Sequence, residues 1–118
     1  MVVFNKNNDI VPIDFGEFKF EFSASDENVK RLMKVSEELS KKVDLDNLTE
    51  DSAFEKAKEI LKKSWDGLFG EEAFEKVYAF SGASTISTAS YLIQTIEGIF
   101  KEAQQFRSQA TFDKYLNK

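Results

Sequence analysis

Carboxylates are the only side chains of this sequence numerous enough to suggest chemistry at a site. The chain of 118 residues contains 21 Asp and Glu residues, but no His and no Cys. Without these two residue types there is no imidazole acid–base catalysis, no thiol nucleophile and no Ser–His or Cys–His arrangement. Zinc sites of the usual Cys and His kind are excluded for the same reason. Most enzyme chemistry is thereby excluded, and the Asp and Glu residues are the first candidates for a metal or catalytic site.

One group of acids has part of the spacing of a calcium-binding loop. Asp44, Asp46 and Glu55 occupy the first, third and last ligand positions of the EF-hand template. However, Leu48 stands where the template needs an oxygen ligand, and Thr49 stands where it needs Gly. We interpret these acids as a loop and a helix start, and we predict no metal and no other cofactor.

Two pairs of adjacent acids also fail as catalytic pairs. Glu37-Glu38 and Glu71-Glu72 are sequence neighbours, and neighbours on a helix point away from each other. The glycines of Gly67-Leu68-Phe69-Gly70 lack the Lys and the preceding strand of a phosphate-binding loop, so we interpret them as helix breakers. We expect a non-enzymatic protein and keep a carboxylate enzyme as an alternative.

Composition and charge favour protein partners. Hydrophobic residues make up 42% of the chain and charged residues 31%, with a formal net charge of -5. The length predicts a single domain over residues 1–118. The chain lacks the excess of basic residues that nucleic-acid binding needs. The N-terminus has no signal-peptide pattern. The uncharged stretch 77–96 is too rich in Ser and Thr to span a membrane. We expect a cytoplasmic protein.

The clearest structural pattern is a β-hairpin over residues 11–22. Apolar residues alternate on both sides of Gly16-Glu17, which suits a two-residue turn. This register places three apolar pairs on one face, namely Phe15 with Phe18, Ile13 with Phe20 and Val11 with Phe22. We expect this aromatic face to pack on helices of the same chain. Pro12 predicts an edge strand, where a second chain could add a strand, and residues 2–4 are predicted as a third strand.

The rest of the chain predicts four helices. The first runs from about residue 26 to 43 after a Ser25 cap, and the second begins at a capping box formed by Ser52 and Glu55. The second ends near Gly67 or Gly70, one of which should have a positive φ. A short helix over 71–80 and a long one over about 85–109 follow. The predicted fold class is mainly α (α+β), with an N-terminal β-hairpin packed on a bundle of about four helices.

The last helix has an apolar surface too broad for one packing partner. We expect the stripe of Ile86, Ile93, Ile96 and Phe100 to face the core. The residues beside it are then the candidate partner-binding side: Tyr91, Leu92, Ile99 and Phe106. The uncharged stretch 77–96 has two interpretations, a buried junction capped by Ser and Thr or a protein-binding surface.

The segment Trp65–Tyr78, with the sequence WDGLFGEEAFEKVY, resembles the tail assembly chaperones of long-tailed phages and prophages of Gram-positive bacteria. In that family a helix ends in a similar LFGE corner, and a short helix with an AFEKIY-like sequence follows. The order of elements is similar from about Pro12 to Phe106. The resemblance implies a non-catalytic protein of the host cytoplasm that coats the tape measure protein, self-assembles, or does both, and is displaced as tail tube subunits polymerise. A head–tail or tail-completion structural subunit is the alternative.

Overall fold

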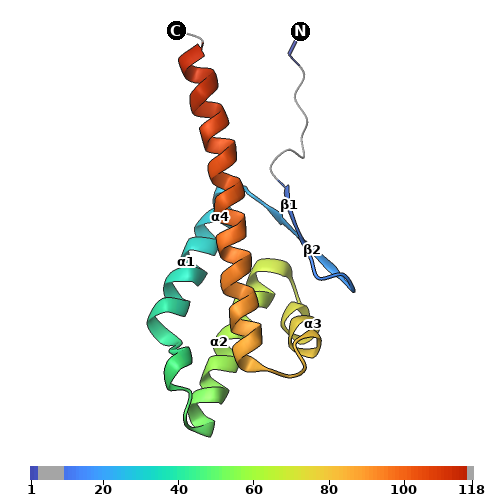
Figure 1. The fold of residues 1–118 in the computed structure, drawn as a ribbon, viewed down its shortest axis with the longest axis vertical. Coiled ribbons are helices and arrows are strands. Elements are labelled where there is room, and N and C mark those ends of the chain that lie inside the picture. The colour runs from blue at the N-terminus through green and yellow to red at the C-terminus, as the bar shows by residue number, and fades with distance from the viewer. Residues whose placement is uncertain (3–9, 117–118) are drawn as a thin grey trace.

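The computed structural model describes residues 1–2 and 10–116, with side chains of the last helix described as far as Ala103 (Figure 1). Its elements are β1 (Ile10–Asp14), β2 (Lys19–Ser23), α1 (Asp26–Lys42), the short 3-10 helix η1 (Leu45–Asn47), α2 (Asp51–Phe69), α3 (Ala73–Phe80) and α4 (Thr85–Leu116). The predicted fold class, an N-terminal hairpin on four helices, is confirmed. The third strand predicted at residues 2–4 lies outside the described residues from Val3 onward.

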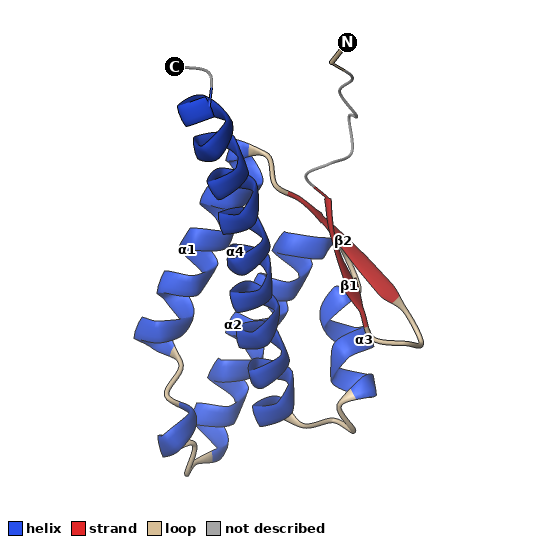
Figure 2. Cartoon of the chain, turned by 45° about the horizontal axis from the view of Figure 1, so that its top comes forward, coloured by secondary structure: helices blue, strands red, loops and turns tan. Residues whose placement is uncertain are grey.

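Helix α2 is the central element of the fold. It packs against α1, α3 and α4, and also against β2. Helix α4 packs against α1 and α3 and reaches β1 of the hairpin, so the two strands rest on different helices. The C-terminal part of α4 extends beyond the other elements in both views (Figures 1 and 2). The longest dimension of the molecule is accordingly 59 Å.

The hairpin has the predicted register and the predicted buried face. Strands β1 and β2 are antiparallel, with the pairs Val11–Phe22, Ile13–Phe20 and Asp14–Lys19. The Phe15 N–H donates to the Phe18 carbonyl over 3.0 Å, and Gly16 between them has a φ of 87°. Val11, Phe20 and Phe22 are buried. The aromatic face therefore packs on helices of its own chain, as expected.

In the part of the chain that the structure describes, β1 pairs with β2 alone, so Pro12 lies at the free edge of a two-stranded sheet. It pairs with Glu21, between the pairs of Val11 and Ile13. Antiparallel pairs alternate between hydrogen-bonded and non-hydrogen-bonded, and counting from the hydrogen-bonded Phe15–Phe18 pair puts Pro12 at a non-hydrogen-bonded position. Its missing N–H would therefore have faced outward, so the proline weakens the free edge and leaves the hairpin ladder intact.

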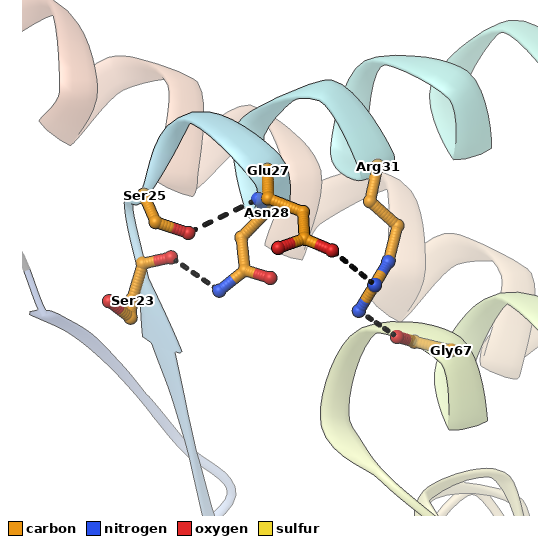
Figure 3. A network of polar contacts seen from close by, with 6 residues as sticks. All are labelled: Ser23, Ser25, Glu27, Asn28, Arg31 and Gly67. Atoms are coloured by element: carbon orange, nitrogen blue, oxygen red, sulfur yellow. Dashed lines mark hydrogen bonds and ion pairs between the residues drawn. The ribbon is translucent and has the colours of Figure 1, made fainter.

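Polar contacts fix the start of α1 to its neighbours (Figure 3). The Ser25 hydroxyl accepts a hydrogen bond from the Asn28 N–H, which confirms the predicted cap. The Asn28 side chain donates to the Ser23 carbonyl at the end of β2 over 2.9 Å. The Arg31 guanidinium donates to the Gly67 carbonyl in the last turns of α2 over 3.3 Å. One turn of α1 is thus connected to both the hairpin and α2.

The predicted capping box of α2 is wrong. The helix begins at Asp51, and its N-cap residue Glu50 makes no side-chain capping bond. Capping by Ser52 would require extended backbone at that residue, but Ser52 already lies inside the first helical turn. The Glu50 carbonyl accepts from the Ala53 and Phe54 N–H groups. The charge of Asp51 at the helix N-terminus favours this earlier start.

A tight corner connects α2 to α3. Helix α2 ends at Phe69, and Gly70 follows with a φ of 101° and a ψ of 172°. The Asp66 carboxylate, still in α2, accepts a hydrogen bond from the Phe74 N–H over 3.0 Å and so caps α3. Lys62 forms an ion pair with Glu75 across the corner. The hydrogen bond between the Lys62 ammonium and the Glu75 carboxylate lowers the pKa of Glu75 below its usual value and raises the pKa of Lys62.

Gly70→Ala is expected to destabilise the protein by about 1–3 kcal/mol, because its backbone angles are open essentially to glycine alone. Gly67→Ala is the matched control, since Gly67 lies inside α2 and an added Cβ would meet no atom within 4 Å. Alanine there should be neutral or stabilising by up to about 1 kcal/mol. Thermal unfolding of both variants checks this pair, and equal melting temperatures would contradict it.

Hydroxyl groups hold the junction between α3 and α4. The Ser81 Oγ accepts from the Ser84 N–H and donates to the Tyr78 carbonyl. The Ser84 Oγ accepts from the Ser87 N–H at the start of α4 over 3.1 Å. Thr88 is fully buried, and its Oγ1 donates to the Ser84 carbonyl over 2.8 Å. This geometry supports the capped junction, while the exposed side chains of Ile86 and Ile93 in the same stretch keep the protein-binding interpretation open.

Candidate protein-binding surface

The structure overturns two of the four residues predicted for partner binding. Leu92 and Ile99 are 0% and 1% exposed, so both belong to the core and not to an outward face. Tyr91 is half-buried, with its ring centroid 6.0 Å from that of Phe15 and 5.8 Å from that of Phe80. Phe106 lies in α4 beyond the residues whose side chains are described. The buried face of α4 is therefore rotated from the predicted one.

Buried threonines explain this rotation. The residues of α4 that pack inward include Thr85, Thr88, Leu92, Ile96 and Ile99, a stripe at helical spacing. A threonine can be buried in a helix when its hydroxyl bonds a carbonyl one turn earlier, as Thr88 does. The predicted stripe contained apolar residues alone, so it included Ile86 and Ile93 and left out the buried Thr85 and Thr88.

The isoleucines predicted to face the core are partly on the surface instead. Ile86 is 49% exposed and Ile93 is 39% exposed, whereas Ile96 is buried as predicted. Ile93 borders a mainly apolar hollow of about 310 Å³ between α1 and α4. This α1/α4 groove is lined by Ser36, Leu39 and Ser40 of α1, by Val43 and Leu45 just after it, and by Ala89, Ile93, Ile96 and Glu97 of α4. Met33, on α1, is also 57% exposed.

A second hollow of about 430 Å³ lies on the opposite flank of the buried face of α4. Its walls are the edge strand β1 and the side of α4 from Tyr91 to Glu102, and Phe80 also lines it. We call it the β1/α4 groove. Phe80 is 38% exposed, and its ring centroid lies 5.3 Å from that of Phe15. Both grooves thus use α4 as one wall, with its core stripe between them.

The aromatic cluster behind the β1/α4 groove keeps its wall in place. Phe15 packs against Phe18, Trp65 and Tyr91, with ring centroids 4.8, 6.2 and 6.0 Å away. Trp65 is fully buried at the centre of the fold. The hairpin tip, the buried Trp65 of α2 and the first turns of α4 are therefore joined through their aromatic rings. Six of the 12 phenylalanines of the sequence belong to this connected set of rings, at positions 15, 18, 20, 22, 69 and 80.

The acids considered for chemistry lie apart or serve structural roles. Asp44 caps η1 by accepting a hydrogen bond from the Asp46 N–H, and Glu55 lies on α2. Glu37 pairs with Lys41 over 2.7 Å, and the two members of Glu71-Glu72 are exposed. In the part of the chain that the structure describes, no three acidic side chains are grouped so that they could hold a metal ion.

The same described residues include no helix with the length and apolar character needed to cross a membrane. Comparison with known proteins gives no family: no family model matches the chain, and no curated protein or solved structure is significantly similar to it.

Proposed function

We propose that this protein is a non-catalytic tail assembly chaperone of a long-tailed phage or prophage, acting in the cytoplasm of the bacterial host. The observation that carries the proposal is the α1/α4 groove, an apolar hollow lined in part by the exposed side chain of Ile93, with the exposed Ile86 two turns earlier on α4. Exposed apolar side chains gathered at a hollow are typical of protein-binding sites. The resemblance of residues 65–78 supplies the partner, the tape measure protein.

The chemistry of the groove suits an apolar helix of that partner. Ile86 and Ile93 are two turns apart on α4, so they present one continuous ridge. An amphipathic helix binds such a surface by laying its apolar face into the hollow. The net charge of -5 keeps a chain with an exposed apolar surface from associating without specificity. The same ridge could also join copies of this chain, as the family resemblance implies.

Ile93→Glu is expected to weaken tape measure binding by about tenfold or more, because a charge placed in a desolvated apolar contact costs more than about 1.4 kcal/mol. Ile93 is 39% exposed, so the variant should still fold. The measurement is co-purification of the tape measure protein of the same phage with the wild type and the variant. Lys101→Gln is the control, since it makes the same change of one unit in net charge and Lys101 is exposed on α4 outside both grooves.

Two outcomes would contradict this proposal. Undiminished co-purification with the Ile93→Glu variant would place any tape measure binding elsewhere. Retention of the protein in purified virions would favour the alternative, a head–tail or tail-completion structural subunit, because a chaperone leaves when the tail tube polymerises. Mass spectrometry of purified particles separates these two classes.

A further inference from the structure

We infer that the β1/α4 groove binds an amphipathic helix that carries basic residues, and that it does not take an added β-strand. This inference is independent of the tail assembly proposal, because it rests on the shape and charge of a different groove. A sheet edge beside an apolar hollow offers two modes of recognition: strand addition, and docking of a helix through its side chains. The structure distinguishes between them.

The edge of β1 is a poor template for a strand. Residues Ile10, Pro12 and Asp14 occupy the non-hydrogen-bonded positions of the hairpin, so their backbone groups face the free edge. Strand addition draws its affinity from a continuous row of backbone hydrogen bonds. Pro12 stands in the middle of this row and has no N–H to donate. Natural proteins use proline at edge strands to prevent such pairing.

The dimensions of the groove fit a short helix. Its α4 wall extends from Tyr91 to Glu102, a rise of about 17 Å. The facing strand has five residues and spans a similar length, about 17 Å. A helix of about three turns has the same length. Gly98 lies in the α4 wall, and a Cβ built there would meet no atom within 4 Å. The groove is therefore open at its middle, where a docked helix could approach closely.

The acidic residues that line the β1/α4 groove favour a partner with basic residues. The charged residues lining the groove in the described part of the chain are Asp14 and Glu102, both exposed acids. The Asp14 carboxylate also accepts a hydrogen bond from the Gly16 N–H, and Asp14 lies across the hairpin from Lys19, so Glu102 is the acid with more of its charge available to a partner. Asp14 precedes Phe15, which packs on Tyr91 at one end of the groove, and Glu102 lies about three turns further along α4. Phe80 and Tyr91 provide apolar contacts at the first end. A three-turn helix with an apolar face and a Lys or Arg near each end matches this arrangement.

Three synthetic peptides test the inference. The first contains Leu and Lys over about four turns of helix, with the leucines at helical spacing. The second has the same composition in strict alternation, which favours a strand. The third has the leucines of the first with Glu in place of Lys. We expect the first to bind at least about tenfold more tightly than the other two, measured by fluorescence anisotropy of labelled peptide.

Two leucine variants locate the binding site. Gly98→Leu fills the middle of the groove and should weaken binding of the first peptide by about tenfold or more. Gly67→Leu is the matched control, a helical glycine with equally open surroundings on α2, outside the groove, and should bind as the wild type does. Circular dichroism checks that both variants fold.

Three results would overturn the inference: equal or tighter binding of the alternating peptide, undiminished binding by Gly98→Leu, or no binding of the helical Lys peptide. Equal binding of the Glu peptide would remove the role of Asp14 and Glu102 and so contradict the basic partner. Since no phage protein enters this experiment, its failure and that of the tape measure test are separate.

Discussion

Ile99→Glu is expected to unfold the protein at neutral pH. Ile99 is 1% exposed and lies on the stripe of α4 that forms the core. A carboxylate there must either remain charged without a partner or take up a proton, and either costs several kcal/mol in addition to the lost apolar contact. Small domains are stable by only about 5–15 kcal/mol. Urea unfolding followed by circular dichroism measures the loss, which we expect to be about 5 kcal/mol or more.

The pH dependence of this variant has a defined sign. Burial raises the pKa of the introduced carboxyl above the unfolded value of about 4.3. The folded state therefore binds this proton more readily than the unfolded state does. The loss of stability relative to the wild type is smallest at pH values below the unfolded pKa. It grows as the pH rises through the folded pKa. Ile93→Glu is the control, because Ile93 is 39% exposed and should lose no more than about 1 kcal/mol. A wild-type unfolding transition for Ile99→Glu at pH 7 would contradict the buried assignment.

Phe20→Ala is expected to lower the free energy of unfolding by about 3–5 kcal/mol. Phe20 is 8% exposed, and its ring stacks on that of Phe69 with centroids 4.9 Å apart and lies 6.0 Å from that of Trp65. Deleting this ring removes the main contact between β2 and α2 and leaves a cavity. Chemical denaturation of the purified variant measures the change.

The neighbouring strand position supplies the control for Phe20→Ala. Glu21 is exposed on the opposite face of β2, so Glu21→Ala should change stability by less than about 0.5 kcal/mol. The contrast also tests the register, because a slip of one residue would exchange the two faces. A loss below about 1 kcal/mol for Phe20→Ala would mean that the hairpin face is not packed on α2.

The hairpin was predictable because its determinants are local. Alternation and the Gly16-Glu17 turn are enough to fix the partner of every residue, and the structure has the same pairs. The cap of α1 at Ser25 and the breaker at Gly70 are local signals of the same kind. The capping box at Ser52 is local as well, yet the helix begins before it. Local signals therefore predicted which elements form more accurately than they predicted the residue at which each element begins.

The inward face of α4 depends on contacts that sequence periodicity does not contain. Apolar residues surround much of this helix, so the face that is buried depends on where α1, α2 and β1 lie. The prediction chose Ile86 and Ile93, whereas Leu92 and Ile99 point inward. The grooves were likewise not predictable, because each is formed by residues of α4 and of an element far from it in the chain. The capping of α3 by Asp66 could have been suspected, since an Asp stands just before the glycine corner.

The contact between β1 and α4 also has a consequence for the order of events during translation. Strand β1 leaves the ribosome well before its helical neighbour α4, because α1, α2 and α3 lie between them in the chain. Contacts that join distant parts of a chain form late and slow folding. The flank of β1 that meets α4 therefore stays uncovered until Ile99 has emerged. Until then the nascent chain exposes aromatic surface to other nascent chains, and completion of α4 ends that exposure.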